Sequence, residues 1–218
     1  MKKIATKILS LLVVLLPVMT IVEPAQARTT AAQVFQTAPA DIFIMADSLT
    51  RLDMIDYFMA GRDTPSRNVA GGDIRLTALS EDSLVVALSE KVTQSLYLLP
   101  AKGDTIFAIV KTYRLPALDS SIKFYNSNWR VLDANKILPL PTHDNWLRKP
   151  SKEARERFAR NVPFVPMQIT IDPISGNLTI VNTLVDLLTK EAMDAVKEDI
   201  KPAIVYTWDG NKFKAVKE

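Results

Sequence analysis

The chain has 218 residues, no cysteine and one histidine, and its 27 Lys and Arg against 24 Asp and Glu give a formal net charge of +3. The absence of cysteine excludes disulfides, thiol catalysis, thiolate metal sites and a lipid-bearing N-terminal cysteine. This length fits one ordinary domain or two small ones, with a core that needs no covalent cross-links.

Residues 1–27 carry the three parts of a secretory signal peptide. Its positive head consists of Lys2, Lys3 and Lys7. An apolar run over 8–22 follows, and Ala25-Gln26-Ala27 is a small-x-small cleavage motif. The run is too short for a transmembrane span of about 20 residues. We therefore expect cleavage near Ala27-Arg28 and an exported chain, periplasmic or secreted, that is soluble and has no transmembrane segment.

Removing this segment changes the charge of the chain. Without its three lysines and Glu23, 24 basic and 23 acidic residues remain, a net charge of +1. A nearly neutral protein gives no electrostatic argument for nucleic-acid binding, and export argues against it again.

The first part of the mature chain is predicted to form a helical cap. Residues 28–38 are rich in Thr, Ala and Gln and predict a loosely ordered entry segment. A short helix is predicted from Pro39 to Met45. A stronger helical pattern follows the capping residues Asp47 and Ser48 and ends at Gly61. Residues 63–72 have the composition of a loop.

From Asp73 the apolar residues alternate with polar ones, which predicts strands. The predicted strands lie around residues 74–78, 84–88, 96–99, 106–113, 122–124 and 129–131. Short strands separated by turn residues predict an antiparallel meander, and the lack of alternating long helices disfavours a parallel α/β sheet.

Residues 133–166 form a Pro-rich connector with a helix predicted at 151–161. Hairpins are predicted at 168–181 and 203–216, with a helix at 189–200 between them. The predicted fold class is α+β: an antiparallel β-meander sheet, or two abutting sheets, with an N-terminal helical cap and two short later helices. We expect residues 28–218 to form a single domain.

No catalytic motif is recognised. The one histidine, His143, lies in the connector and no Gly-x-Ser-x-Gly elbow is present, so an exposed loop histidine is the simpler interpretation. Ser120 and Lys123 match Ser-x-x-Lys formally, but a strand sends them to opposite faces. Asp53 and Asp56 can do acid/base work only if buried together, and a solvated helix face is the commoner case. We predict no catalytic residue, metal or cofactor.

The candidate binding residues are basic or aromatic. The basic stretch consists of Arg148, Lys149, Lys152, Arg155, Arg157 and Arg160, offset by Glu153 and Glu156. It can face anionic lipid head groups or an acidic partner, although a solvated face is the commoner explanation of such a stretch. Tyr125 and Trp129 can stack on sugars or peptides at a sheet edge, although strand aromatics usually belong to the core.

Three segments carry a resemblance to a known family. Residues 51–58 (Arg-Leu-Asp-Met-Ile-Asp-Tyr-Phe), 76–88 and 124–129 (Phe-Tyr-Asn-Ser-Asn-Trp) resemble small secreted proteins from Bacteroidetes grouped as a domain of unknown function. The resemblance covers most of 35–215. It implies export and an α+β fold, and it assigns no activity or functional residue. It also implies that three Asp-Ser/Thr-aliphatic triplets resemble O-glycosylation signals, with Ser48, Ser83 and Thr105 as acceptors.

The leading hypothesis is an exported, non-enzymatic binding or interaction module. Its partner would be an unknown protein, a glycan or an envelope component. The alternatives are a hydrolase that acts on glycan or peptide through carboxylates such as Asp53 or Asp56, and a structural component of an envelope assembly.

Overall fold

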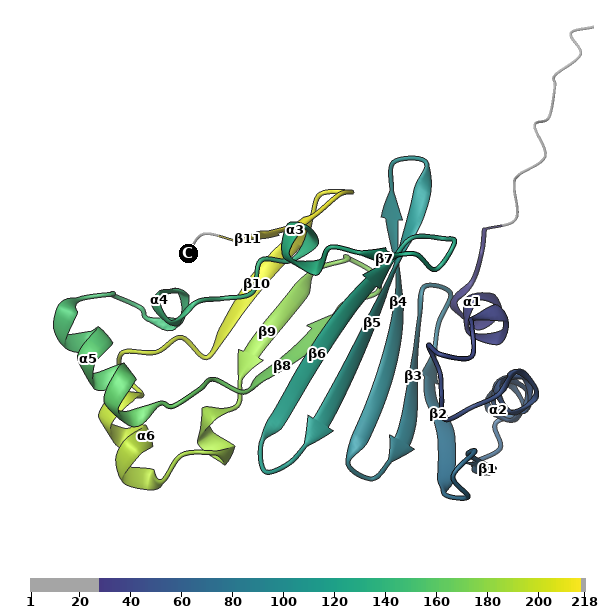
Figure 1. Cartoon of the computed structure of the whole chain (residues 1–218), viewed down its shortest axis with the longest axis horizontal. Helices are drawn as coiled ribbons and strands as arrows, with labels where there is room; N and C mark the ends of the chain where they lie inside the picture. Colours follow the sequence, from purple (N-terminus) through teal and green to yellow (C-terminus); the bar gives the residue numbers. More distant parts are fainter. Residues whose placement is uncertain (1–27, 217–218) are drawn as a thin grey trace, which may run out of the picture.

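The computed structural model describes residues 28–216, so the predicted signal peptide lies outside the described residues. Its strands form two antiparallel sheets (Figure 1). The large sheet contains β1 (Ser66–Arg67), β2 (Asp73–Leu79), β3 (Ser83–Ser89), β4 (Val92–Ala101), β5 (Asp104–Arg114), β6 (Leu118–Tyr125) and β7 (Val131–Leu132). The small sheet contains β8 (Met167–Ile171), β9 (Leu178–Asn182), β10 (Ala203–Trp208) and β11 (Phe213–Ala215). The helices are α1 (Ala31–Thr37), α2 (Ser48–Met59), α3 (Ala134–Ile137), α4 (His143–Trp146), α5 (Lys152–Asn161), the 3₁₀ helix η1 (Leu184–Asp186) and α6 (Lys190–Val196).

The large sheet is a meander in which each strand pairs with the next one in the chain, β1 through β7. The small sheet has the order β11-β10-β9-β8, again with sequential neighbours. The α+β class and the antiparallel meander are therefore confirmed, and the structure has two sheets rather than one. The short strand β1 lies where the sequence predicted only a loop.

One face of the large sheet is covered by α1 and α2, at the right of Figure 1. Leu84, Val86 and Leu96 on this face are fully buried, and they belong to one apolar cluster with Phe35 of α1 and Met54 of α2. Asp47 caps α2 by accepting a hydrogen bond from the backbone N–H of Thr50 (2.8 Å), as predicted.

The prediction for the entry segment was wrong. Residues 31–37 form α1, whereas no α-helix forms at the predicted 39–45. Thr30 and Gln33 make a capping box, in which each side chain accepts a hydrogen bond from the other's backbone N–H. Burial of Val34 and Phe35 against the sheet supplies the stability that a helix this short lacks by itself.

The opposite face of the large sheet packs on the small sheet and on the connector. Phe124 and Val110 of the large sheet share a second apolar cluster with Ile180 of β9 and with Trp146 and Phe158. The last two belong to α4 and α5, within the predicted Pro-rich connector. Ser151 caps α5 as predicted, accepting a hydrogen bond from the backbone N–H of Ala154 (3.1 Å). Across residues 28–216, no helix is long and apolar enough to cross a membrane.

The two sheets meet along β6 and β8 through side chains rather than a backbone ladder. The Ser120 hydroxyl accepts a hydrogen bond from the backbone N–H of Ile169, and the Asp119 carboxylate accepts one from that of Met167, both at 3.1 Å. The Ser120 hydroxyl also bonds Thr112 (2.8 Å). Because Ser120 and Lys123 have opposite parity on strand β6, they point to opposite faces, as predicted.

Candidate functional site: a cleft between the two sheets

Two arginines of the basic stretch are bound to acids. Nε and Nη2 of Arg155 donate to the Asp144 carboxylate at 2.8 and 2.9 Å. Nε and Nη2 of Arg157 donate to the Asp199 carboxylate at the same distances. The hydrogen bonds from Arg155 lower the pKa of Asp144, and those to Asp144 raise the pKa of Arg155. The charges of both arginines are therefore paired within the fold instead of being free for a partner.

The other basic residues are exposed around the start and end of α5: Arg148, Lys149, Lys152 and Arg160. Their side chains have no ion-pair partner in the part of the chain that the structure describes. Binding of an anionic partner at these four residues stays a prediction.

Tyr125 and Trp129 lie on the face of the large sheet that α1 and α2 cover, whereas the basic stretch lies beyond the opposite face. Tyr125 is buried in the cluster under α1 and α2. The Trp129 ring packs against Phe107 and Tyr125, with centroid separations of 4.8 and 5.6 Å. Burial, followed by the charge of Asp41, raises the pKa of Tyr125. The structure thus does not bring these aromatic residues together with the basic stretch, and their role in binding stays a prediction.

The candidate catalytic side chains are also apart. Asp53 and Asp56 are both exposed on α2, and His143 is exposed on α4 with its ring 5.4 Å from Phe158. Among residues 28–216, no group of three or more His, Asp and Glu side chains is placed to hold a metal ion.

A cavity of about 540 Å³ lies where the ends of the two sheets meet, and we call it the inter-sheet cleft. The β2–β3, β4–β5 and β8–β9 turns all lie at this end, the upper end in Figure 1. The cleft is lined by Arg28, Trp208 and the segments 80–82, 97–100 and 171–176.

Aromatic and aliphatic side chains form the floor and one wall of the inter-sheet cleft. Leu99 and Ile171 are buried beneath it, while Tyr97 and Trp208 are partly exposed. The Trp208 indole N–H donates to the Pro100 carbonyl at 2.7 Å, and its ring packs on Phe213 with centroids 4.9 Å apart. The hydrogen bond joins β10 to β4, so the indole is fixed between the two sheets.

The β8–β9 turn forms a rigid rim. The Asp172 carboxylate accepts hydrogen bonds from the Ser175 hydroxyl (2.7 Å) and the backbone N–H of Ile174 (3.0 Å). These bonds lower the pKa of Asp172 and keep it ionised. Gly176 has a positive φ of 68°, a conformation that favours glycine. The turn presents Ile174 with 96% of its surface exposed, although such a residue normally avoids water.

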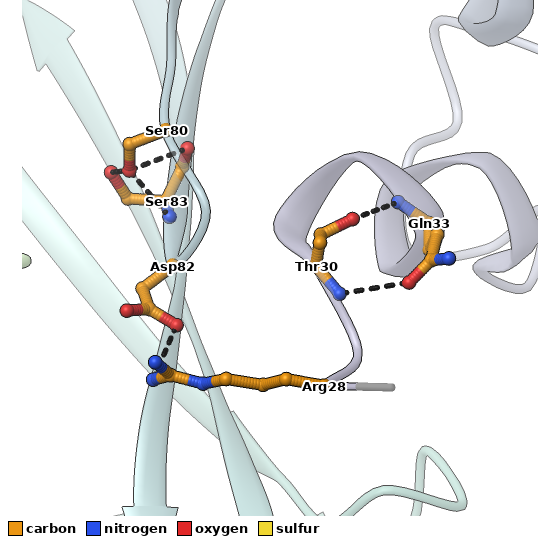
Figure 2. A network of polar contacts seen from close by, with 6 residues as sticks. All are labelled: Arg28, Thr30, Gln33, Ser80, Asp82 and Ser83. Carbon is orange, nitrogen blue, oxygen red and sulfur yellow. Dashed lines mark hydrogen bonds and ion pairs between the residues drawn. The ribbon is translucent and has the colours of Figure 1, made fainter. Parts of the chain in front are cut away.

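Polar residues line the cleft beside the β2–β3 turn, and Figure 2 shows the ion pair of Arg28 with Asp82 among them. Arg28 reaches from the N-terminal segment to the β2–β3 turn, where its Nη2 lies 2.8 Å from Oδ1 of Asp82. The backbone N–H of Ala31 donates to the Glu81 carbonyl at 2.7 Å. Oδ1 of Asp82 is buried, and this ion pair is its one polar contact among the described residues.

Sequence reasoning missed the residues of the inter-sheet cleft. Tyr97 and Trp208 look like ordinary strand aromatics, and their meeting depends on the packing of two sheets. Ile174 gave a usable signal, because an isoleucine between Pro173 and Ser175 is an unusual choice at the tip of a tight turn.

The fold and the cleft define a two-sheet α+β protein with an open pocket at the sheet junction. The chain belongs to the family described as "Protein of unknown function (DUF3256)", which matches residues 24–213. This confirms the predicted resemblance to a domain of unknown function, while export stays a prediction.

A solved structure shares this fold. It is a domain of an uncharacterized protein from Porphyromonas gingivalis W83, similar with a TM-score of 0.74 and 18% sequence identity. The alignment covers 86% of this chain and 98% of that one. No curated protein matches the sequence.

Proposed function

We propose that this protein is an exported, non-enzymatic binding module whose ligand enters the inter-sheet cleft. The observation that carries the proposal is the fixed, partly exposed ring of Trp208 facing a rigid turn that holds Ile174 in solvent. A preformed, mainly apolar pocket with a few polar groups is the usual form of a ligand site. The Trp208 ring, already fixed by its hydrogen bond to Pro100, also loses little entropy when a partner covers it.

The polar groups of the cleft support binding better than catalysis. The Asp172 carboxylate is held by its own turn with a lowered pKa, so it is a poor proton donor at neutral pH. The Ser80 hydroxyl is bonded to that of Ser83 at 2.9 Å. The alternative of a carboxylate hydrolase has less support, because Asp53 and Asp56 are exposed on α2 and do not line the cleft.

The site is tested with matched charge insertions. Ile174→Lys places an ammonium group on the cleft rim, and Leu49→Lys places one on the exposed side of α2, where Leu49 is 67% exposed. Wild-type protein and the two variants are compared in chemical cross-linking and gentle affinity capture from the native envelope and periplasm. Thermal unfolding verifies that both variants fold.

We expect the same ligand with wild type and Leu49→Lys and its loss with Ile174→Lys. Equal capture by all three proteins would show that the cleft is not the site. Capture of nothing by wild type would contradict the binding function, and quantitative recovery in one large envelope complex would support the structural-component alternative instead.

Export is tested on the protein from its native cells. We expect it in the periplasm or medium, with Arg28 as its first residue by N-terminal sequencing. Recovery of an uncut cytoplasmic chain would contradict export. Intact mass then tests glycosylation, since a mass equal to residues 28–218 alone excludes it at Ser48, Ser83 and Thr105.

The acids of the three triplets also have local roles in the fold. Asp47 caps α2, Asp82 pairs with Arg28, and the Asp104 carboxylate accepts the backbone N–H of Thr105 at 2.7 Å. These contacts explain why aspartate occupies the three positions without any need for glycosylation of the neighbouring Ser or Thr.

A further inference from the structure

The inter-sheet cleft has an excess of negative charge. Glu81, Asp82 and Asp172 line it, and Arg28 is the one cation among its lining residues. Glu81 is exposed and its carboxylate has no ion-pair partner in residues 28–216. Such a cleft attracts a cationic group and repels carboxylates and phosphates.

The cleft already holds one guanidinium group, and the chain itself supplies it. The side chain of Arg28 is 64% exposed whereas that of Asp82 is 21% exposed, so the acid belongs to the wall and the cation reaches it from outside (Figure 2). Arg28 comes from the segment before α1, where Thr30 has an extended backbone. An arginine on an extended segment is therefore an arrangement that this wall accepts.

The remaining lining suits the stem of a long basic side chain. The floor over the buried Leu99 and Ile171 is apolar, and the partly exposed rings of Tyr97 and Trp208 give methylene groups a surface to pack on, which lysine and arginine cover while their charged ends stay polar. Tyr97 and Trp208 stand beside that floor, and aromatic rings attract cations through their faces. The Trp208 N–H is already bonded to Pro100, so the ring has no free polar group there to satisfy.

We propose that the inter-sheet cleft binds a lysine or arginine side chain on an extended segment of a partner protein, and that Arg28 competes with it for Asp82. The inference rests on the proposed function, namely that the cleft is the ligand site, and it names the chemistry of the ligand. Arg28 acts as an internal occupant that the partner's cation displaces.

The probes are blocked pentapeptides of alternating Thr and Val with a central arginine, lysine, citrulline or glutamate. Citrulline keeps the shape of arginine without its charge. Binding to the mature protein is measured by calorimetry and by the ¹⁵N shift of the Trp208 indole N–H. We expect the arginine and lysine peptides to bind and the citrulline peptide to bind about tenfold more weakly.

Three variants test which residues bind the cation of the peptide. Asp82→Asn is expected to weaken the arginine peptide about tenfold, and Glu81→Gln about threefold. Arg28→Gln should strengthen it severalfold because the internal competitor is gone. The matched control is Asp63→Asn, which removes a carboxylate from another arginine pair, that with Arg75 at 2.6 Å.

Asp63→Asn should leave peptide affinity unchanged. Unfolding curves check that Asp82→Asn folds. If Asp82→Asn does not fold, Glu81→Gln still tests the proposal, because it changes only an exposed carboxylate. Equal binding of the arginine and citrulline peptides would overturn the proposal, as would unchanged affinity in both Asp82→Asn and Glu81→Gln. Weaker binding by Arg28→Gln would overturn the competitor role of Arg28.

The two proposals fail differently. If native ligands depend on Ile174 but the peptides show no preference for positive charge, the cation proposal fails and the binding function stands. If native capture is the same with Ile174→Lys as with wild type and the peptides do not shift the Trp208 resonance, both proposals fail together.

Discussion

The basic stretch and the inter-sheet cleft show opposite relations between sequence and surface. The stretch is conspicuous in the sequence, yet Arg155 and Arg157 are bound to acids that lie 11 and 42 residues away. The cleft consists of residues that are ordinary in their own strands and turns, yet packing leaves an exposed isoleucine and a fixed indole together. A charge run predicts a binding surface only when the fold supplies no counter-ions to it.

Truncating one apolar side chain in each region should give the largest difference between them, measured as the loss in the free energy of unfolding. Phe158→Ala empties a buried site beneath α5 and is expected to lower the free energy of unfolding by about 3–5 kcal/mol. Ile174→Ala at the cleft rim should change it by no more than about 0.5 kcal/mol, because that side chain contributes little to the core. Urea unfolding followed by circular dichroism measures both. Equal losses would show that the rim, too, is structural.

Removing the ion pairs of the basic stretch should change the free energy of unfolding by a smaller amount. In a double-mutant cycle, Arg157→Ala and Asp199→Ala are expected to show a coupling of about 1 kcal/mol, because the pair is bidentate and partly buried, with exposures of 41% and 22%. The Arg155–Asp144 pair, 50% exposed on both sides, should couple more weakly. Raising the salt concentration should reduce both couplings. A coupling of zero for Arg157 would mean that its charge is free to bind a partner.

The smallest expected effect is a change in the pKa of Asp209, which lies beside the cleft. Asp209 follows Trp208, and its pKa is lowered from 3.8 to about 2, first by the hydrogen bond from Lys214 and then by the backbone N–H of Lys212. Because the folded pKa lies below the unfolded one, this stabilisation is present above pH 3.8 and is lost as the pH falls toward about 2.

Lys214→Ala should raise the pKa of Asp209 toward its ordinary value, as measured by carboxyl ¹³C shifts in an NMR titration. Asn211→Ala serves as the control, since that change keeps the backbone N–H that donates to Asp209 at 2.9 Å. A pKa that does not move in Lys214→Ala would assign the shift to the backbone donors alone.

Local patterns predicted most of the fold. The alternation in residues 73–125 and the turn residues between them fix strands, and Asp47, Ser151 and Thr189 cap helices by bonds to residues three positions on. The α1 helix was missed although the Thr30-x-x-Gln33 spacing of a capping box is visible in the sequence. The Thr-, Ala- and Gln-rich composition of residues 28–38 instead led to the prediction of a loosely ordered segment. The helix forms because strands far along the chain bury Phe35.

The candidate site was much less predictable. Contacts such as Trp208 to Pro100, which joins residues 108 positions apart, depend on how two sheets pack. The same holds for the Arg28–Asp82 pair, because the N-terminal segment must first dock on the β2–β3 turn.

The sequence by itself determined the α+β class, the antiparallel meander, the exclusion of cysteine chemistry and the near-neutral charge after residue 27. These follow from composition and from periodicities that act over a few residues. Only the tertiary structure decided that the strands divide into two sheets, that Arg155 and Arg157 are neutralised, and that a cleft opens beside Trp208. Those outcomes depend on which distant side chains share a buried surface, and no local pattern carries that information.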